Sequence, residues 1–285
     1  MKNVFIDTNI LLSFFSYSTD HLNKLEELVE LIKKKKVHLF ISQQVVDEFN
    51  RNRDVKLKEV LKNLNTFSMD LKSPVVCHDL KEMKELQEVL SKASELKKKL
   101  IDATIIQIKS KMLKADKLIN EIFSISNPIS ISEIIFNRAR RRFDIGNPPG
   151  KNASYGDAIN WEALLEVVPN SENLYFIVRD KDYVSAIDQN DFSSFLKDEW
   201  KTKKKSEIIY YDLLSKFLKD NFVETKITDE EVKDERTVAE QEPSSPLNDS
   251  YIYFPELQRS IEEFQRDLVR KWREGVEILK RKSEK

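Results

Sequence analysis

The stretch Val4-Phe5-Ile6-Asp7-Thr8-Asn9 places a carboxylate directly after a short apolar run. Such a run, followed by polar residues, predicts a short buried strand that ends at Asp7. In an α/β sheet the carboxyl ends of the strands converge on one crevice, so we expect Asp7 to lie at that crevice. Whether the chain forms such an α/β sheet depends on whether further strands end in the same way.

Strands and helices are predicted to alternate along the chain. Residues 22–32 carry apolar residues at helical spacing, and residues 37–41 return as a strand, which completes a βαβ unit. Further strands are predicted at residues 174–178 and 208–210, with helices at 158–168 and 211–218. This alternation predicts an α/β fold with three layers, α/β/α, around a central parallel sheet with right-handed crossovers.

Three other acidic residues, Glu48, Asp157 and Asp180, also stand at the ends of apolar runs. We expect them to meet Asp7 at the same edge of the sheet despite their separation in sequence. Carboxylates that share one site raise each other's pKa unless divalent cations neutralise them. The arrangement therefore predicts a magnesium or manganese site.

The segments around these residues resemble the four acidic motifs of PIN-domain nucleases, in the same order. Val4-Phe5-Ile6-Asp7-Thr8-Asn9 resembles the first strand and catalytic aspartate, and Glu48 resembles the glutamate on the helix after the second strand. Gly156-Asp157-Ala158-Ile159 and Val178-Arg179-Asp180-Lys181-Asp182-Tyr183 are similar to the third and fourth motifs. The resemblance spans roughly residues 1 to 220.

Two details qualify this resemblance. Val178 stands where a small hydroxyl residue is common in the family, and Asp182 is an alternative holder of the fourth acidic role. The loop Gly146-Asn147-Pro148-Pro149-Gly150-Lys151 is similar to one in a larger bacterial PIN-like subfamily.

The resemblance implies a metal-dependent endonuclease that acts on single-stranded RNA, with DNA as an alternative substrate. Two Mg²⁺ or Mn²⁺ ions about 4 Å apart would activate a water and stabilise the leaving oxygen. Asp7, Asp157 and Asp180 would be ligands, and Glu48 would bind an ion or position the water. Thr8 and Asn9 would orient these ligands. Small bacterial relatives suggest a toxin or phage-defence effector.

Two other classes of function were weighed. Some PIN-like domains are scaffolds or RNA-binding modules that have lost acidic residues, whereas this chain fills all four positions. A phosphatase or nucleotide hydrolase would carry a glycine-rich phosphate loop, but the chain has four glycines in total and no Gly-x-x-x-x-Gly-Lys pattern.

Composition narrows the remaining choices. The 285 residues suit one catalytic domain with additions. No apolar run approaches the ~20 residues that cross a bilayer, and a strand rather than a signal peptide follows Met1, so we expect a cytoplasmic protein without membrane contact. Cys77 is the only cysteine, and His21, His38 and His78 lack metal-ligand spacing, which argues against zinc chemistry.

Basic residues near the acidic motifs are candidates for contact with the phosphate backbone. They are Arg51, Arg138, Arg140, Arg141, Arg142 and Lys151. Arg51 follows Glu48 by three residues and so shares its helix face. The alternative for the arginines near residue 140 is an ordinary solvated helix face.

We divide the chain into three parts. Residues 1–222 form the PIN-like domain, with a helical insertion at 79–123 that either packs on it or covers the substrate. Residues 223–250 are acidic and contain prolines, which predicts a linker. Residues 251–285 carry an apolar stripe typical of an amphipathic helix, which either packs on the domain, binds a second copy or partner protein, or touches nucleic acid.

Overall fold

A computed structural model describes residues 1–16, 21–66, 80–150 and 155–241 of the chain. Its sheet has four parallel strands in the order β2-β1-β3-β4. The strands are β1 (Lys2–Ile6), β2 (Val37–Phe40), β3 (Leu174–Ile177) and β4 (Ile208–Tyr211). Val4 of β1 lies opposite Leu39 of β2 and Tyr175 of β3. The predicted parallel sheet is confirmed.

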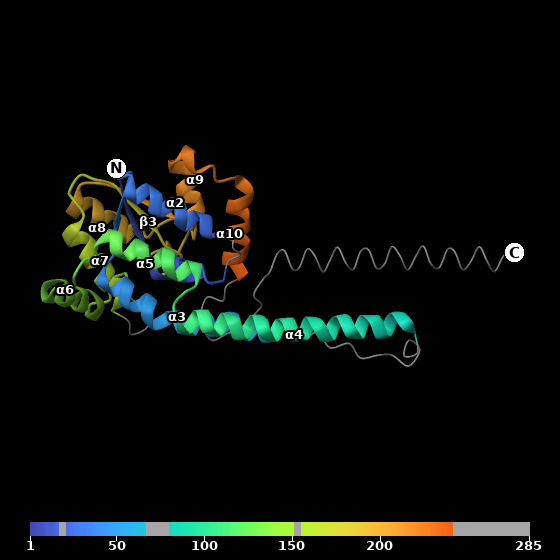
Figure 1. Cartoon of the computed structure of the whole chain (residues 1–285). Helices are drawn as coiled ribbons and strands as arrows, with labels where there is room; N and C mark the ends of the chain where they lie inside the picture. The colour runs from blue at the N-terminus through green and yellow to red at the C-terminus, as the bar shows by residue number, and fades with distance from the viewer. Residues whose placement is uncertain (17–20, 67–79, 151–154, 242–285) are drawn as a thin grey trace. The chain divides into compact units, whose positions relative to one another are not determined.

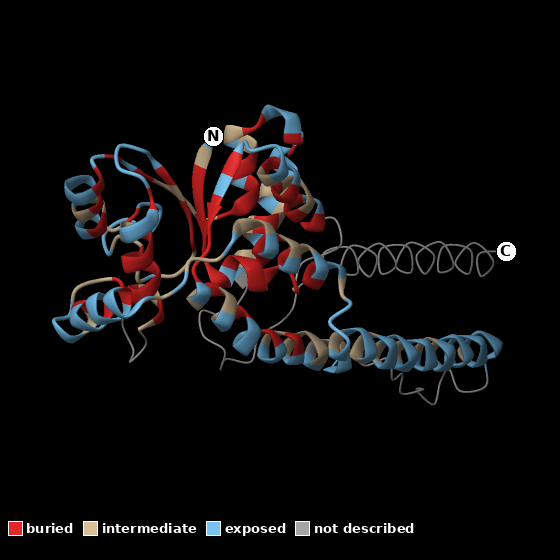
Figure 2. Cartoon of the chain, turned by 60° about the vertical axis from the view of Figure 1, so that its left-hand side comes forward, coloured by how far each residue is buried: buried red, intermediate tan, exposed pale blue. Residues whose placement is uncertain are grey.

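Helices lie on both sides of the strands (Figure 1, Figure 2), which confirms the three-layer α/β/α prediction. In chain order they are α1 (Thr8–Ser13), α2 (Leu22–Lys33), α3 (Gln43–Thr66), α4 (Lys81–Lys109), α5 (Lys114–Ser126), α6 (Glu133–Asp144), α7 (Gly156–Val167), α8 (Ser194–Lys204), α9 (Leu214–Asn221) and α10 (Asp229–Gln241), with a short 3-10 turn, η3 (Val223–Thr225), before α10. Helix α2 contacts α5 and α9, whereas α7 contacts α3, α6 and α8.

The core forms because the strands are apolar on both faces, as expected for a parallel sheet covered by helices. Phe5 of β1 and Phe176 of β3 are fully buried, and their ring centroids are 4.6 Å apart. On the α7 side, Trp161 packs against Trp200 of α8 with ring centroids 5.7 Å apart. Trp161 also packs against Phe176 of β3, with ring centroids 6.2 Å apart, which holds α7 against the sheet.

The insertion expected at 79–123 corresponds to α4 and the first part of α5. Helix α5 packs against α2 and buries Ile119 and Ile122. Helix α4 has no buried residue, and it runs beside α3 as a hairpin that leaves the domain (Figure 1, Figure 2). The described part of the insertion therefore divides into a packed helix and an exposed one.

A buried ion pair closes the base of the α3–α4 hairpin. Arg53 of α3 donates from Nε and Nη2 to the two carboxylate oxygens of Asp116 on α5, both at 2.6 Å. Its Nη2 also donates to the carbonyl of Ile108 on α4 at 3.0 Å. Three helices are thus joined at one guanidinium group, which is 3% exposed.

Part of the segment expected to be a linker, residues 223–250, is the helix α10. Glu235 of α10 and Lys24 of α2 form an ion pair in which both side chains are 1% exposed. Asn23 also donates to Glu231 at 3.1 Å. The acidic composition predicted a solvated segment, but one of its carboxylates has a buried partner in a distant helix.

The chain divides into a compact unit, Met1–Ala239, and a second unit, Glu240–Lys285. The predicted amphipathic helix at 251–285, Cys77, His78 and Lys151 lie outside the described residues. Among the described helices, none is both long and apolar enough to span a bilayer.

Candidate functional site

The first acidic residue is held between two strands. Asp7 follows the last residue of β1, and its N–H donates to the carbonyl of Ile177, the last residue of β3, at 3.0 Å. Its side chain caps α1, because Oδ2 accepts the N–H of Asn9 at 3.3 Å. Asp7 is only 3% exposed. Backbone pairing and helix capping together fix this carboxylate at the carboxyl edge of the sheet.

Glu48 reaches the same region from α3. This helix begins at Gln43, and the hydroxyl of the preceding Ser42 accepts the N–H of Val45 at 3.1 Å, as an N-cap does. Glu48 lies in the second turn and is half-buried. The end of β2 and the start of α3 therefore direct Glu48 toward the strand ends.

The third and fourth acidic residues are joined by a tyrosine. Asp157 lies in the first turn of α7, and Asp180 lies three residues after β3 ends. The Tyr183 hydroxyl donates to the backbone carbonyl of Asp157 at 3.2 Å, and the Tyr183 N–H donates to the carbonyl of Asp180 at 3.2 Å. Asp180 Oδ1 also accepts the N–H of Asp182 at 2.9 Å.

The four carboxylates interact electrostatically. Burial raises the pKa of Asp7 well above its usual range, and the charges of Asp157, Glu48 and Asp180 raise it further. Burial, followed by the charges of Asp180, Glu48 and Asp182, raises the pKa of Asp157 to about 7. Burial also raises the pKa of Glu48, with a contribution from Asp180. The structure thus brings the four residues into one negative cluster.

The donor chemistry of this cluster fits a hard divalent cation, which prefers oxygen ligands. The Thr8 hydroxyl is fully buried and has no hydrogen-bond partner of good geometry, although it lies near enough to Glu48 to favour the charged carboxylate. Within the described ranges, no three His, Cys, Asp or Glu side chains are already close enough to hold one ion. The four acidic residues therefore suit a divalent cation in kind, but their side chains are farther apart than the ligands of one ion.

Three of the arginines near residue 140 lie on the exposed surface of α6. Arg138 pairs with Glu166 of α7 at 2.6 Å, and Arg140 approaches Asp144 at 3.6 Å. Arg141 is exposed as well. On α3, exposed Arg51 lies close enough to Glu48 to lower its pKa against the effect of burial. These four side chains are accessible to a phosphate backbone.

Arg142 has a different environment from the one we expected. It is 5% exposed and bonds to Glu162 of α7 and Glu199 of α8, at 2.8 and 2.5 Å. It also donates to the carbonyl of Pro148 at 2.6 Å. Since its guanidinium group is enclosed by these partners, Arg142 joins three segments of the domain and is not free to reach a phosphate.

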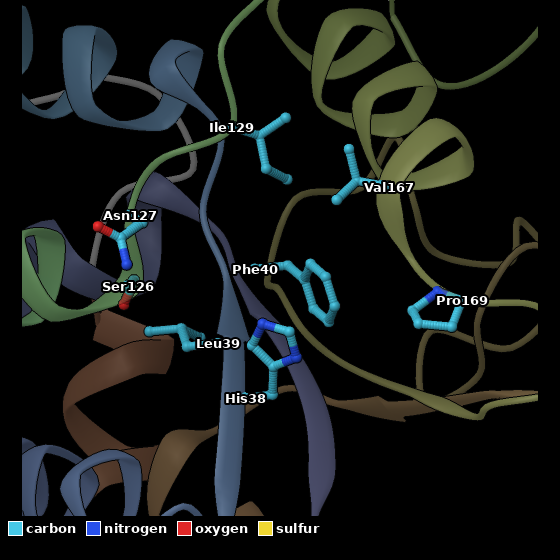
Figure 3. Close-up of a pocket in the computed structure, with 8 residues that line it drawn as sticks. All are labelled: His38, Leu39, Phe40, Ser126, Asn127, Ile129, Val167 and Pro169. Atoms are coloured by element: carbon cyan, nitrogen blue, oxygen red, sulfur yellow. The ribbon is translucent and has the colours of Figure 1, made fainter.

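A pocket of about 240 Å³ lies elsewhere, beside the outer edge of β2 (Figure 3). It is lined by His38, Leu39, Phe40, Ser126, Asn127, Ile129, Val167 and Pro169. None of these residues carries a carboxylate, and Val167 is at the opposite end of α7 from Asp157. This pocket is therefore separate from the acidic cluster.

Sequence reasoning gave no role to Asn160 or Tyr183, although both lie beside the acidic residues. Asn160 follows Asp157 by three residues, which places the two on one helix face, and it is a fully buried polar residue in an otherwise apolar run. A polar residue within this apolar run could have indicated from the sequence that Asn160 has a role at the site. The bond from the Tyr183 hydroxyl to Asp157 could not be predicted from the sequence, which shows only that Tyr183 follows Asp180 by three residues.

A comparison with protein families matches residues 4–183 of the chain to the PIN domain. The matched range begins in β1, ends at Tyr183 and contains all four acidic residues. Neither a curated protein nor a solved structure matches the chain.

Proposed function

Because the chain belongs to the PIN-domain family, we propose that it is a divalent-metal-dependent endonuclease that cleaves single-stranded RNA. The observation that carries this proposal is the cluster of Asp7, Glu48, Asp157 and Asp180, whose charges act on one another at the carboxyl edge of the sheet. A cluster of this kind is costly to fold without a cation, so its presence favours an enzyme over a scaffold. The preference for RNA over DNA rests on the family.

Asp7, Asp157 and Asp180 would hold Mg²⁺ or Mn²⁺, with two ions as the expected number, and Asp182 is the alternative ligand at the fourth position. Bound ions of this type lower the pKa of a water and offset the charge on the leaving oxygen. Glu48 completes the set as a ligand or as the group that orients the attacking water. Thr8 and Asn9 orient the carboxylates beside them.

Exposed arginines would hold the phosphate backbone during cleavage. Arg51 lies next to Glu48, and the α6 surface with Arg138, Arg140 and Arg141 adjoins α7, which carries Asp157. Lys151 is a further candidate by sequence. Such contacts would be independent of base sequence and sensitive to salt.

Because small bacterial PIN proteins often act as toxins or phage-defence effectors, we propose such a role in the cytoplasm for this chain. We also propose that residues 251–285 bind a second copy or a partner protein, because an amphipathic stripe requires an apolar surface to cover it.

The test uses purified full-length protein with end-labelled single-stranded RNA and DNA of one sequence, in Mn²⁺, Mg²⁺ or chelator. We expect internal cleavage of RNA with either metal and none with chelator. The Asp7→Asn variant is the matched negative control, because it keeps the size of the side chain and removes its charge. RNA binding without cleavage under every condition would reject the nuclease and favour the non-catalytic RNA-binding module. Cleavage of DNA alone would reassign the substrate.

A further inference from the structure

We propose that Asn160 and Tyr183 are positioning residues, which set α7 relative to the other elements that carry the acidic cluster. The proposal rests on the nuclease function above and concerns how the ligands reach their final spacing. Asn160 connects α7 to the start of α3, which carries Glu48. Tyr183 connects α7 to the segment after β3, which carries Asp180.

The link from α7 to α3 is one buried hydrogen bond. The Ser42 hydroxyl donates to Asn160 Oδ1 at 2.5 Å, and the two residues are 1% and 0% exposed. The same Ser42 oxygen accepts the N–H of Val45, so it belongs to the first turn of α3. The Asn160 Nδ2 group is buried and has no hydrogen-bond partner among the residues that the structure describes. A buried amide side chain costs stability unless its polar atoms are hydrogen-bonded, so the bond to Ser42 holds Asn160 in one orientation.

The link from α7 to the segment after β3 is the Tyr183 side chain. Its ring is fully buried and lies 5.0 Å from the ring of Phe176 on β3, measured between centroids. The hydroxyl donates to Asp157, and the backbone N–H donates to Asp180, both at 3.2 Å. The Tyr183 side chain therefore connects the sheet with the third acidic residue, and its backbone is bonded to the fourth.

Both links end on one turn of α7, at residues 157 and 160. This matters because metal ligands of the oxygen type bind at about 2.0 to 2.2 Å, so a small displacement of a helix removes a ligand. Among the described residues no three His, Cys, Asp or Glu side chains are close enough to hold one ion, and the two links hold the turn of α7 that carries Asp157. Residues that orient metal ligands typically change metal affinity by about 10 to 100-fold when they are replaced.

The test measures Mn²⁺ binding directly, by titration calorimetry on metal-free full-length protein, together with the melting temperature. Tyr183→Phe removes only the hydroxyl, and Asn160→Leu keeps the approximate volume of the side chain. We expect each variant to bind Mn²⁺ at least about tenfold more weakly than the parent. Ser42→Ala removes the same hydrogen bond as Asn160→Leu. If the Asn160→Leu protein does not fold, the Ser42→Ala protein is tested in its place.

Two matched controls lose comparable hydrogen bonds at the amino edge of the sheet. Tyr175→Phe loses the bond from Lys2 Nζ at 2.7 Å, and Ser206→Ala loses the buried bond from Trp200 Nε1 at 3.0 Å. Both controls should bind Mn²⁺ within about twofold of the parent, whatever their effect on stability.

The outcomes separate the inference from the function on which it rests. Variants that melt at lower temperature but bind Mn²⁺ as the parent does would overturn the positioning role and leave only a structural one. Equal losses of affinity in the variants and the controls would overturn it as well. A parent protein that binds no Mn²⁺ would instead refute the metal-dependent nuclease itself.

Discussion

Replacing Asp157 by Asn should remove cleavage and, in metal-free protein, increase stability. Burial and the charges of Asp180 and Glu48 raise the pKa of this carboxyl from 3.8 to about 7. A shift of about 3 pKa units corresponds to about 4 kcal/mol, because each unit is worth about 1.36 kcal/mol. Asn has no charge to bury, so this amount is the upper bound of the stability gained.

The pH dependence has a definite sign. The pKa of Asp157 is higher in the folded protein than in the unfolded chain, so the folded state binds the proton more tightly. The destabilisation due to this group is therefore absent below about pH 4, grows as the pH rises toward 7 and is complete above that value. Bound Mn²⁺ should remove it by neutralising the cluster.

The assay is urea denaturation in chelator at pH 4 and pH 8, repeated with Mn²⁺ at pH 8. In chelator we expect Asp157→Asn to exceed the parent in unfolding free energy at pH 8 by up to about 4 kcal/mol and to match it at pH 4. With Mn²⁺ the parent alone should gain stability. Asp198→Asn, which changes an exposed carboxylate on α8, is the control and should have little effect. An Asp157→Asn protein that is no more stable than the parent at pH 8 in chelator would refute the charge argument.

Three further predictions concern the basic residues and the end of the chain. The double variant Arg140→Ala and Arg141→Ala should bind RNA more weakly, with the slope of log affinity against log salt reduced by about 0.7 per lost contact, and an unchanged slope would return these residues to a solvated helix face. Arg142→Ala should instead destabilise the fold by about 3 to 5 kcal/mol in urea denaturation, because buried Glu162 loses its ion-pair partner and half-buried Glu199 loses one of its partners, and a fully stable variant would contradict the buried network. Deleting residues 251–285 should yield a smaller particle by light scattering with the rest of the chain still folded, whereas full-length protein that is monomeric at high micromolar concentration would rule out constitutive self-association through them.

The strands and the family were predictable because their signals are local. Apolar runs such as residues 4–6 and 174–178 are short and continuous, as in buried strands, and are followed within two residues by Asp7 and Asp180, and a parallel sheet then brings those ends together. The cluster of Asp7 and Asp157 followed from this topology, although its role in metal binding stays a prediction. The exposed part of α6 was also visible from the sequence.

What the sequence did not reveal depends on partners that are distant in the chain. Arg142 belongs to an arginine-rich run that is typical of a solvated face, and only the fold brings α7 and α8 around it. Glu235 lies among acidic residues that suggested a linker, yet its charge is matched by Lys24, more than 200 residues away. The composition of a segment describes only its own residues, so it could not indicate that Lys24 in α2 would pair with Glu235.

The bonds from Arg53 to Ile108 and Asp116 join α3, α4 and α5 at one place within the range that matches the family. Beyond Arg53, Leu57 of α3 is 4% exposed and packs in the core, whereas α4 has no buried residue. Helix α4 is therefore held to the domain near its carboxyl end, at Ile108, and has no buried residue along its length. A fluorescent label on an exposed α4 position such as Leu96 would test whether this helix moves while cleavage is measured in the same sample.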